Sequence, residues 1–393
     1  MTTARHTYPG LDSLRALAAL AVLTTHVSFY SGGYSTSLVG TALARLDVGV
    51  AIFFVLSGFL LGRPYVAAAI RGGRTDSAAR YLWKRALRIL PVYWVSVTVA
   101  LVVFAANREM PVSRWLTNLS LTDVFLSDAL PSGLTQMWSL SIEAAFYLAL
   151  PLLFWVGARA VRGQWTSRRL YIATALLGAL NIAWVALSGS LLKPLFEATA
   201  WWLPSYFLWF ALGIALAVAA TTPEGSPSRI SSALRAVALN PGTCWTAAGA
   251  LFLVACTPLA GPVQLALLTR DQSVAKLVLY GAVAALIVLP SALGDDSNRY
   301  GKVLAAPVLR HLGHVSYCLF CCHQTILLLV ADHGGFVLFG GDGLRFFAVT
   351  LLLSLLAAEA LHWLVERPVQ RWRTWGGDPS REIITPNDTA TRT

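Results

Sequence analysis

The chain has 393 residues, of which 56% are hydrophobic and only 12% are charged, and its mean hydropathy is +0.62. This composition excludes an ordinary soluble enzyme, in which about 45–50% of the residues are apolar. The net charge of +11 could indicate nucleic-acid binding, but the basic residues lie in loops beside apolar segments, which favours membrane topology and attraction to anionic lipids.

Apolar segments of about 20 residues, each long enough to cross a ~30 Å hydrocarbon core, recur along the chain. We expect about ten membrane-spanning helices, near residues 11–30, 46–62, 88–106, 137–157, 170–188, 200–220, 243–259, 274–293, 311–331 and 345–364. Most Lys and Arg residues fall on one side of the membrane if the N- and C-termini are cytoplasmic, as the positive-inside rule requires. The sequence therefore predicts an all-α, polytopic membrane protein, with one transmembrane domain (1–375) and a polar, disordered cytoplasmic tail (376–393).

The first apolar segment carries ionisable residues, which cost ~2.5–3.5 kcal/mol each to insert and so need a partner or a function. Arg15 and His26 are eleven residues apart, so a helix projects both from one face, about 16 Å apart along its axis. With a cytoplasmic N-terminus, His26 lies in the outer half of the membrane, and Glu143 of the fourth segment reaches the same depth. A carboxylate beside an imidazole can orient a general base, and a purely structural pair is the alternative.

Three further arginines gather near the cytoplasmic ends of the second and third segments. Arg85 and Arg88 share a helical face, and Arg63 leaves the second segment at the same level. With Arg15 they could clamp the phosphates of a donor through forked guanidinium contacts, although each alone could equally be a membrane anchor. A phosphate-bearing donor below and a base above would form a two-ended site.

Three of the five cysteines lie in the stretch SYCLFCCHQ, residues 316–324. Cys318, Cys321, Cys322 and His323 could suggest a metal site, but they lie inside an apolar segment. Small side chains of this kind commonly pack between membrane helices. We therefore expect no disulfide and no metal.

Six motifs follow one another along nearly the whole chain, from Leu11 to Pro368. They are LDSLRALAALAVLTTH (11–26), VGVAIFFVLSGFLL (48–61), KRALRILPVYW (84–94), WSLSIEAAFY (138–147), SYCLFCCH (316–323) and HWLVERP (362–368). Together they resemble membrane acyltransferase family three, the acyl-CoA-dependent integral membrane O-acyltransferases. The chain looks like the stand-alone type, without a C-terminal hydrolase-like domain.

The resemblance implies a bacterial plasma-membrane enzyme that moves an acyl group, most often acetyl, from acyl-CoA to a hydroxyl of a sugar, glycolipid or glycosylated natural product. It implies no permanently bound cofactor. The family's catalytic histidine falls on His26, its Trp-Ser-Leu-x-x-Glu motif on Trp138 and Glu143, and its donor contacts on Arg15, Arg85 and Arg88. Supporting roles could fall to Asp12, Trp138, Ser141 and His323, the last of which could orient its neighbours. Departures at Ser13 and Ala144 bear on fine specificity.

The expected reaction has two possible courses and one rival. His26, oriented by Glu143, could deprotonate the acceptor hydroxyl directly, or it could carry the acyl group as a covalent intermediate. The rival is a secondary transporter or exporter of a glycan or lipid, which would also need many helices and intramembrane ions. The sequence has no paired broken helices and no internal symmetry, which favours the enzyme.

Overall fold

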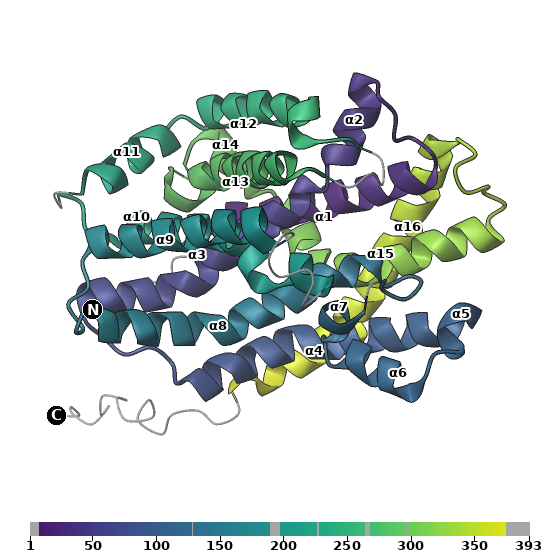
Figure 1. The fold of residues 1–393 in the computed structure, drawn as a ribbon, viewed down its shortest axis with the longest axis horizontal. Helices are drawn as coiled ribbons and strands as arrows, with labels where there is room; N and C mark the ends of the chain where they lie inside the picture. Colours follow the sequence, from purple (N-terminus) through teal and green to yellow (C-terminus); the bar gives the residue numbers. More distant parts are fainter. Residues whose placement is uncertain are drawn as a thin grey trace, which may run out of the picture.

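The computed structural model describes residues 8–127, 129–188, 197–225, 228–263, 268–295 and 297–374, and every regular element in these ranges is helical (Figure 1). Within them, nine segments are long and apolar enough to cross a membrane: Pro9–Tyr30, Leu38–Arg71, Ala78–Val103, Thr135–Ala160, Ser167–Leu187, Leu203–Thr221, Arg270–Leu293, Pro307–His333 and Gly343–Gln370. The predicted all-α, multi-pass fold is thus confirmed. The side of the membrane that holds the termini stays a prediction, and the expected tail, 376–393, lies outside the described residues.

The tenth expected span, near 243–259, is a broken element. Helices α11 (Arg229–Ala238) and α12 (Pro241–Ala255) meet at 93°, so they form a tenth span only when taken together. Pro241 begins α12 and lacks the N–H that a continuous helix would need, which explains the break. A helix of 15 residues extends about 22 Å, less than the ~30 Å hydrocarbon core.

Long helices form the body of the protein, and shorter ones lie between and beside them (Figure 1). The long helices are α1 (Pro9–Tyr30), α3 (Val48–Arg71), α4 (Ala78–Val103), α8 (Trp138–Ala160), α9 (Ser167–Leu187), α10 (Phe207–Thr221), α13 (Arg270–Leu293), α15 (Pro307–His333) and α16 (Gly343–Leu361). The short helices are α2 (Leu38–Arg45), α5 (Ala105–Arg108), α6 (Val112–Leu119), α7 (Asp123–Leu126), α14 (Arg299–Leu304) and α17 (Arg367–Gln370). A π-helical turn, His362–Glu366, joins α16 to α17.

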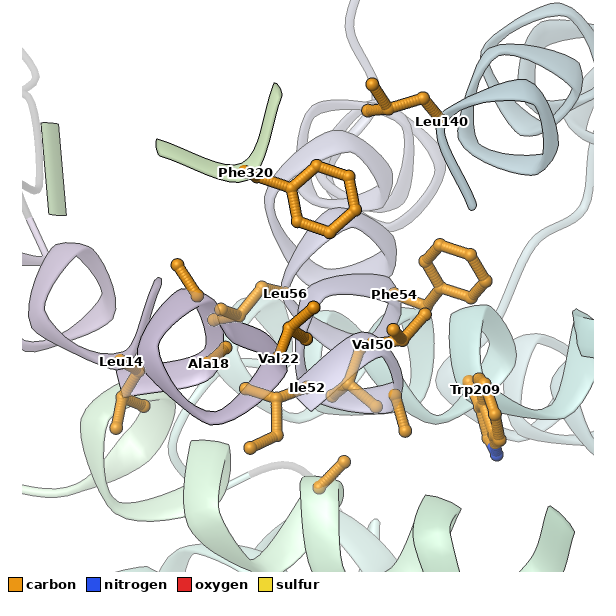
Figure 2. Packing of buried hydrophobic residues seen from close by; sticks show 14 of the residues in the cluster. Leu14, Ala18, Val22, Val50, Ile52, Phe54, Leu56, Leu140, Trp209 and Phe320 are labelled. Atoms are coloured by element: carbon orange, nitrogen blue, oxygen red, sulfur yellow. The ribbon is translucent and has the colours of Figure 1, made fainter. Parts of the chain in front are cut away.

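Helices α1, α3, α10 and α15 form the centre of the bundle, where α1 packs against both α3 and α15. The most apolar window of α15 is 72% buried, whereas that of the segment containing α16 is only 22% buried. Helix α15 is therefore surrounded by protein, whereas α16 lies at the periphery, where a membrane helix faces lipid. Figure 2 shows the small and branched side chains of α1, such as Ala18 and Val22, among those of α3, such as Val50 and Ile52.

Glycines let the central helices approach each other at backbone distance. A Cβ on Gly313 of α15 would overlap the carbonyl oxygen of Asp12 in α1. In the same way, a Cβ on Gly58 of α3 would overlap the carbonyl oxygen of Phe210 in α10. Close packing of this kind drives association between helices in a bilayer, where water supplies no hydrophobic effect. The contact at Gly313 fixes α15 against α1, the two helices that carry His323 and His26.

Candidate active site

Two cavities lie between the central helices. The larger, about 830 Å³, is here named the aromatic cavity, and its lining includes His26, Gln136, Trp138, Trp201, Tyr206 and Trp209. The smaller, about 100 Å³, is named the arginine chamber, and its lining includes Arg15, Ser57, Arg85, Arg88, Glu143 and Tyr147. Arg15 and His26, both on α1, therefore belong to different cavities. The two cavities, one lined by arginines and the other by His26, correspond in position to the two ends of the expected site.

His26 of α1 forms a hydrogen bond with His323 of α15. The distance from His26 Nδ1 to His323 Nε2 is 2.9 Å, and the two ring planes lie 7° apart. On its other side, His323 Nδ1 lies 2.8 Å from the carbonyl oxygen of Phe320 and 3.2 Å from that of Leu319. His323 is only 1% exposed, so protein groups supply its hydrogen bonds.

These contacts determine which ring nitrogens carry protons. Carbonyl oxygens only accept hydrogen bonds, so His323 Nδ1 must donate, and its Nε2 then holds a lone pair when the ring is neutral. His26 Nδ1–H donates to that lone pair, which leaves the lone pair of the neutral His26 ring at Nε2. His26 also lines the aromatic cavity, and in its neutral ring Nε2 is the nitrogen that can accept a hydrogen bond.

Glu143 does not pair with His26, as its depth in the membrane suggested. Its Oε1 accepts hydrogen bonds from Ser57 Oγ and, at 2.9 Å, from Tyr147 Oη, and the residue lines the arginine chamber. The expected pairing of His26 with Glu143 is thus replaced by one with His323. Matching depth along two helices says nothing about the direction in which each side chain points, and here the two point into different cavities.

The expected arginine cluster is present in part. Arg15, Arg85 and Arg88 line one chamber, whereas Arg63 is absent from its lining and lies over the ring of Tyr8, 4.9 Å from the centroid. Arg15 Nη1 lies 3.1 Å from Asp12 Oδ1. Among the described residues, no hydrogen-bond partner reaches the buried Nε of Arg85. Arg85 therefore has unused donor capacity for an anion.

Arg88, in contrast, is bound by a buried carboxylate. Its Nη1 pairs with Oε1 of Glu366, a residue of the π-helical turn that is only 1% exposed. Gln370 Nε2 also donates to Oε1, at 2.9 Å, while His362 Nδ1 and Cys318 Sγ approach Oε2 at 2.8 and 3.3 Å. Protein donors thus surround both oxygens of Glu366.

Cys318, His362 and Glu366 have ligand atoms within 4.8 Å of one another and are by type a possible metal set. The hydrogen bonds and the Arg88 guanidinium already satisfy the Glu366 carboxylate, so its burial needs no cation to explain it. The five cysteines are free.

The aromatic cavity combines flat rings with a few polar groups. The ring of Trp138 lies 5.2 Å from those of both Trp201 and Tyr206. Gln136 Nε2 donates to the carbonyl oxygen of Cys321 at 3.1 Å, which fixes the amide, and no described residue reaches its buried Oε1. Burial raises the pKa of Tyr34, in the loop after α1, to about 12, so this phenol stays protonated. Such a wall suits a ligand with apolar faces and hydroxyl edges.

The other two expected supporting residues, Ser141 and Asp12, contact neither cavity directly. Ser141 is buried and is absent from the lining of both cavities. Asp12 binds Arg15, and its Oδ2 lies 3.5 Å from His314 Nε2.

Sequence reasoning missed Glu366 and Gln136. Glu366 stood in the motif HWLVERP, four residues after His362, and a charged residue there should have been matched with an intramembrane arginine. Gln136 precedes an apolar segment, and nothing in the sequence marks it as a site residue. Its place in the lining of the aromatic cavity depends on the fold.

The chain was compared with known proteins. A family model described as an acyltransferase domain matches residues 8–363. YrhL of Bacillus subtilis (strain 168), named provisionally as a peptidoglycan O-acetyltransferase, is 26% identical over 94% of this chain and 56% of its own length. The acyltransferase MdmB of Streptomyces mycarofaciens is 27% identical over 92% of each chain. The O-acetyltransferase OatA of Staphylococcus aureus (strain NCTC 8325 / PS 47) is 23% identical over 92% of this chain and 57% of its own length.

The chain thus spans little more than half the length of two of these relatives. No solved structure matches it. The family model covers most of the chain, including His26, Glu143, the three chamber arginines and His323. The chain therefore belongs to the membrane acyltransferase family defined by this domain.

Proposed function

We propose that the protein transfers a short acyl group, acetyl first among the candidates, from acyl-CoA to a hydroxyl of a sugar-containing acceptor. His26 is the general base, His323 is its positioning residue, and the arginine chamber receives the donor. The relatives named as O-acetyltransferases support this reaction class, and YrhL, named for peptidoglycan, supports a glycan acceptor. The identity of the donor and the role of each residue are our proposal.

The observation that carries the proposal is the hydrogen-bonded chain from the carbonyl oxygens of Leu319 and Phe320 through His323 to His26. This chain gives the free lone pair of His26 a fixed direction. A base must be positioned within hydrogen-bond reach of the proton that it removes. The side chain of His323 cannot turn without losing its carbonyl partners, so it holds the His26 ring in place.

The proposed step balances as follows. His26 Nε2 takes the proton of the acceptor hydroxyl while the hydroxyl oxygen attacks the thioester carbonyl carbon. The carbon–sulfur bond breaks, the thiolate of CoA leaves, and the proton on Nε2 passes to that sulfur. The products are the acyl ester and CoA thiol, and His26 returns to its starting state.

The arginine chamber supports a donor that carries phosphates. Arg85 has a buried Nε without a described partner, and guanidinium groups bind phosphate oxygens through short charge-assisted hydrogen bonds. Arg15 retains donors beyond the one that meets Asp12. Arg88 is held by Glu366, so we assign it a positioning role. Glu143 then orients Ser57 and Tyr147 at the chamber wall instead of acting on His26.

The test is a transfer assay with purified protein in nanodiscs, acetyl-CoA labelled in the acetyl group, and a panel of glycan acceptors. His26→Ala should lower the transfer rate by about 10²–10⁴-fold, the usual contribution of a general base. His333→Ala is the matched control, because His333 is an exposed histidine at the end of α15. Transfer at the wild-type rate by a folded His26→Ala variant would overturn the proposal.

The same assay separates direct transfer from an acyl-histidine. If Nε2 attacks the thioester itself, labelled acyl-CoA without acceptor leaves label on the chain at His26, detectable by peptide mass spectrometry after rapid acid quench. Direct transfer leaves the chain unlabelled and needs the acceptor for any turnover.

A further inference from the structure

Phe320 stands between the two cavities. Of the described residues that line either cavity, Phe320 is the one that lines both. Its side chain is 5% exposed, and its ring meets that of Phe53 edge-on, with the centroids 5.9 Å apart and the planes at 74°. Figure 2 shows the ring projecting from α15 toward α3. The ring therefore forms a partition between the arginine chamber and the aromatic cavity.

The partition belongs to one face of α15 that connects the chamber to the histidine pair. Tyr317, Phe320 and His323 follow at intervals of three residues, so they form a continuous stripe on the helix. Tyr317 Oη donates to the carbonyl oxygen of Ile89 at 2.7 Å, which ties this stripe to α4. The Phe320 ring lies 5.7 Å from that of His323, between centroids. Phe320 thus lies between Tyr317, which lines the chamber, and the histidine pair.

The chamber on the arginine side of the ring is small. Its volume of about 100 Å³ is far below the about 830 Å³ of the aromatic cavity. A space of this size favours a two- or three-carbon acyl group over a long chain. Leu140 and Ile89, which also line the chamber, are apolar and buried.

We infer that Phe320 is a specificity-determining residue, which limits the acyl group to a short chain and keeps water of the aromatic cavity away from the thioester. This inference rests on the proposed function. The reaction that the ring suppresses is hydrolysis: a water oxygen attacks the thioester carbonyl, the carbon–sulfur bond breaks, one water proton passes to the thiolate, and a carboxylic acid and CoA thiol result. Water exclusion of this kind prevents the loss of reactive acyl groups.

The experiment compares wild type with Phe320→Ala and the milder Phe320→Leu, using acetyl-, propionyl-, butyryl- and hexanoyl-CoA with one glycan acceptor. In wild type, transfer should fall steeply beyond propionyl. In Phe320→Ala, the ratio of butyryl to acetyl transfer should rise on the order of tenfold. Acceptor-independent hydrolysis of acetyl-CoA should rise by a similar factor, and Phe320→Leu should show both effects to a smaller degree.

Phe346→Ala is the matched control. Phe346 is equally buried, at 2% exposed, but packs on Phe336 away from both cavities. Its loss should destabilise the chain without changing either ratio. If folded Phe320→Leu and Phe320→Ala keep the wild-type donor preference and hydrolysis, the inference is wrong while the proposed function stands.

A measurement that needs no turnover distinguishes failure of the inference about Phe320 from failure of the proposed function. Val22 lines the aromatic cavity and is 2% exposed, so Val22→Cys places a thiol beyond the partition. A charged, membrane-impermeant methanethiosulfonate is added only on the side that the arginine chamber faces, and labelling is read peptide by peptide. The thiol should react several-fold faster when Phe320→Ala is added. Equal rates in both backgrounds would overturn the partition, even if wild type transferred no acyl group and the proposed function had failed.

Discussion

Two polar pairs connect neighbouring helices in this protein, and they differ in which hydrogen-bonding groups they leave without a partner. His26 and His323 bridge α1 and α15 through one directed hydrogen bond, and the chain of donors ends in a lone pair at the aromatic cavity. Arg88 and Glu366 bridge α4 and the π-helical turn, and the carboxylate receives donors on both oxygens. The first pair is open at one end, and the second is closed.

The two pairs show how a catalytic residue can be distinguished from a structural one among the ionisable residues inside a membrane. Both pairs meet the general requirement that a polar group in a membrane has a partner. The Glu366 carboxylate of the closed pair has no capacity left for a substrate, so its contribution is to hold helices together. An open chain has a defined vacancy, and only such a vacancy can accept a proton or bind a ligand.

Removal of Glu366 should give the largest effect on stability. Glu366→Ala leaves the guanidinium of Arg88, whose side chain is 25% exposed, without its counter-charge. The loss of a partner costs about 3–5 kcal/mol for a fully buried charge, so we expect a smaller loss here, but one above about 1 kcal/mol. The thermal unfolding midpoint in detergent measures this loss. The matched control is Glu359→Ala, whose pair with His311 is partly exposed and worth below about 1 kcal/mol. Similar midpoints for both variants would contradict a closed structural pair.

Replacement of His323 should affect rate more than binding. His323→Leu removes the acceptor that holds His26 Nδ1–H, and a misplaced base costs about 10²-fold in kcat. KM for both substrates should stay within about twofold, and His323→Gln, which keeps an acceptor oxygen, should recover part of the rate. A proportional rise in KM with unchanged kcat would place His323 in substrate binding.

The arginines should separate according to their cavities. Arg85→Ala removes charge-assisted hydrogen bonds that are each worth about 1.5–3 kcal/mol, so KM for acyl-CoA should rise about tenfold or more. Arg63→Ala should change it by less than about twofold, because Arg63 packs on Tyr8 outside the chamber lining. Steady-state kinetics with varied donor measures both. An equal rise in the donor KM for both variants would show that Arg63 and Arg85 act on the donor together.

Gln136 should give the smallest effect, confined to the acceptor. Gln136→Leu removes the free Oε1 from the aromatic cavity, and one neutral hydrogen bond of about 1 kcal/mol corresponds to about a fivefold rise in acceptor KM. The donor KM should not change. A change in the donor KM alone would show that Gln136 faces the thioester rather than the acceptor.

The His26–His323 pair shows how much of the site could be predicted from the sequence. The helices and their approximate bounds follow from apolar length, and His26 stood out because an imidazole in a spanning segment is costly. Its partner did not follow, because Glu143 and His323 both reach a plausible depth and only the rotation of α8 and α15 about their axes separates them. That rotation depends on backbone contacts such as Gly313 on Asp12, which no periodicity encodes.

The arginines also show what could not be predicted from the sequence. Arg85 and Arg88, three residues apart, share a helical face and looked equivalent in the sequence. The structure separates them because Glu366, nearly 280 residues later in the chain, meets only Arg88. Long-range pairing of this kind requires the fold.

The most direct test of the account is the tautomer of His26. Nitrogen-15 NMR of histidine-labelled protein in nanodiscs, with His26→Gln used to assign the signal, reports which ring nitrogen carries the proton. The hydrogen-bonded chain predicts a neutral ring with hydrogen on Nδ1 and a lone pair on Nε2. Hydrogen on Nε2, or on both nitrogens, would leave no base at the cavity and would contradict the central claim.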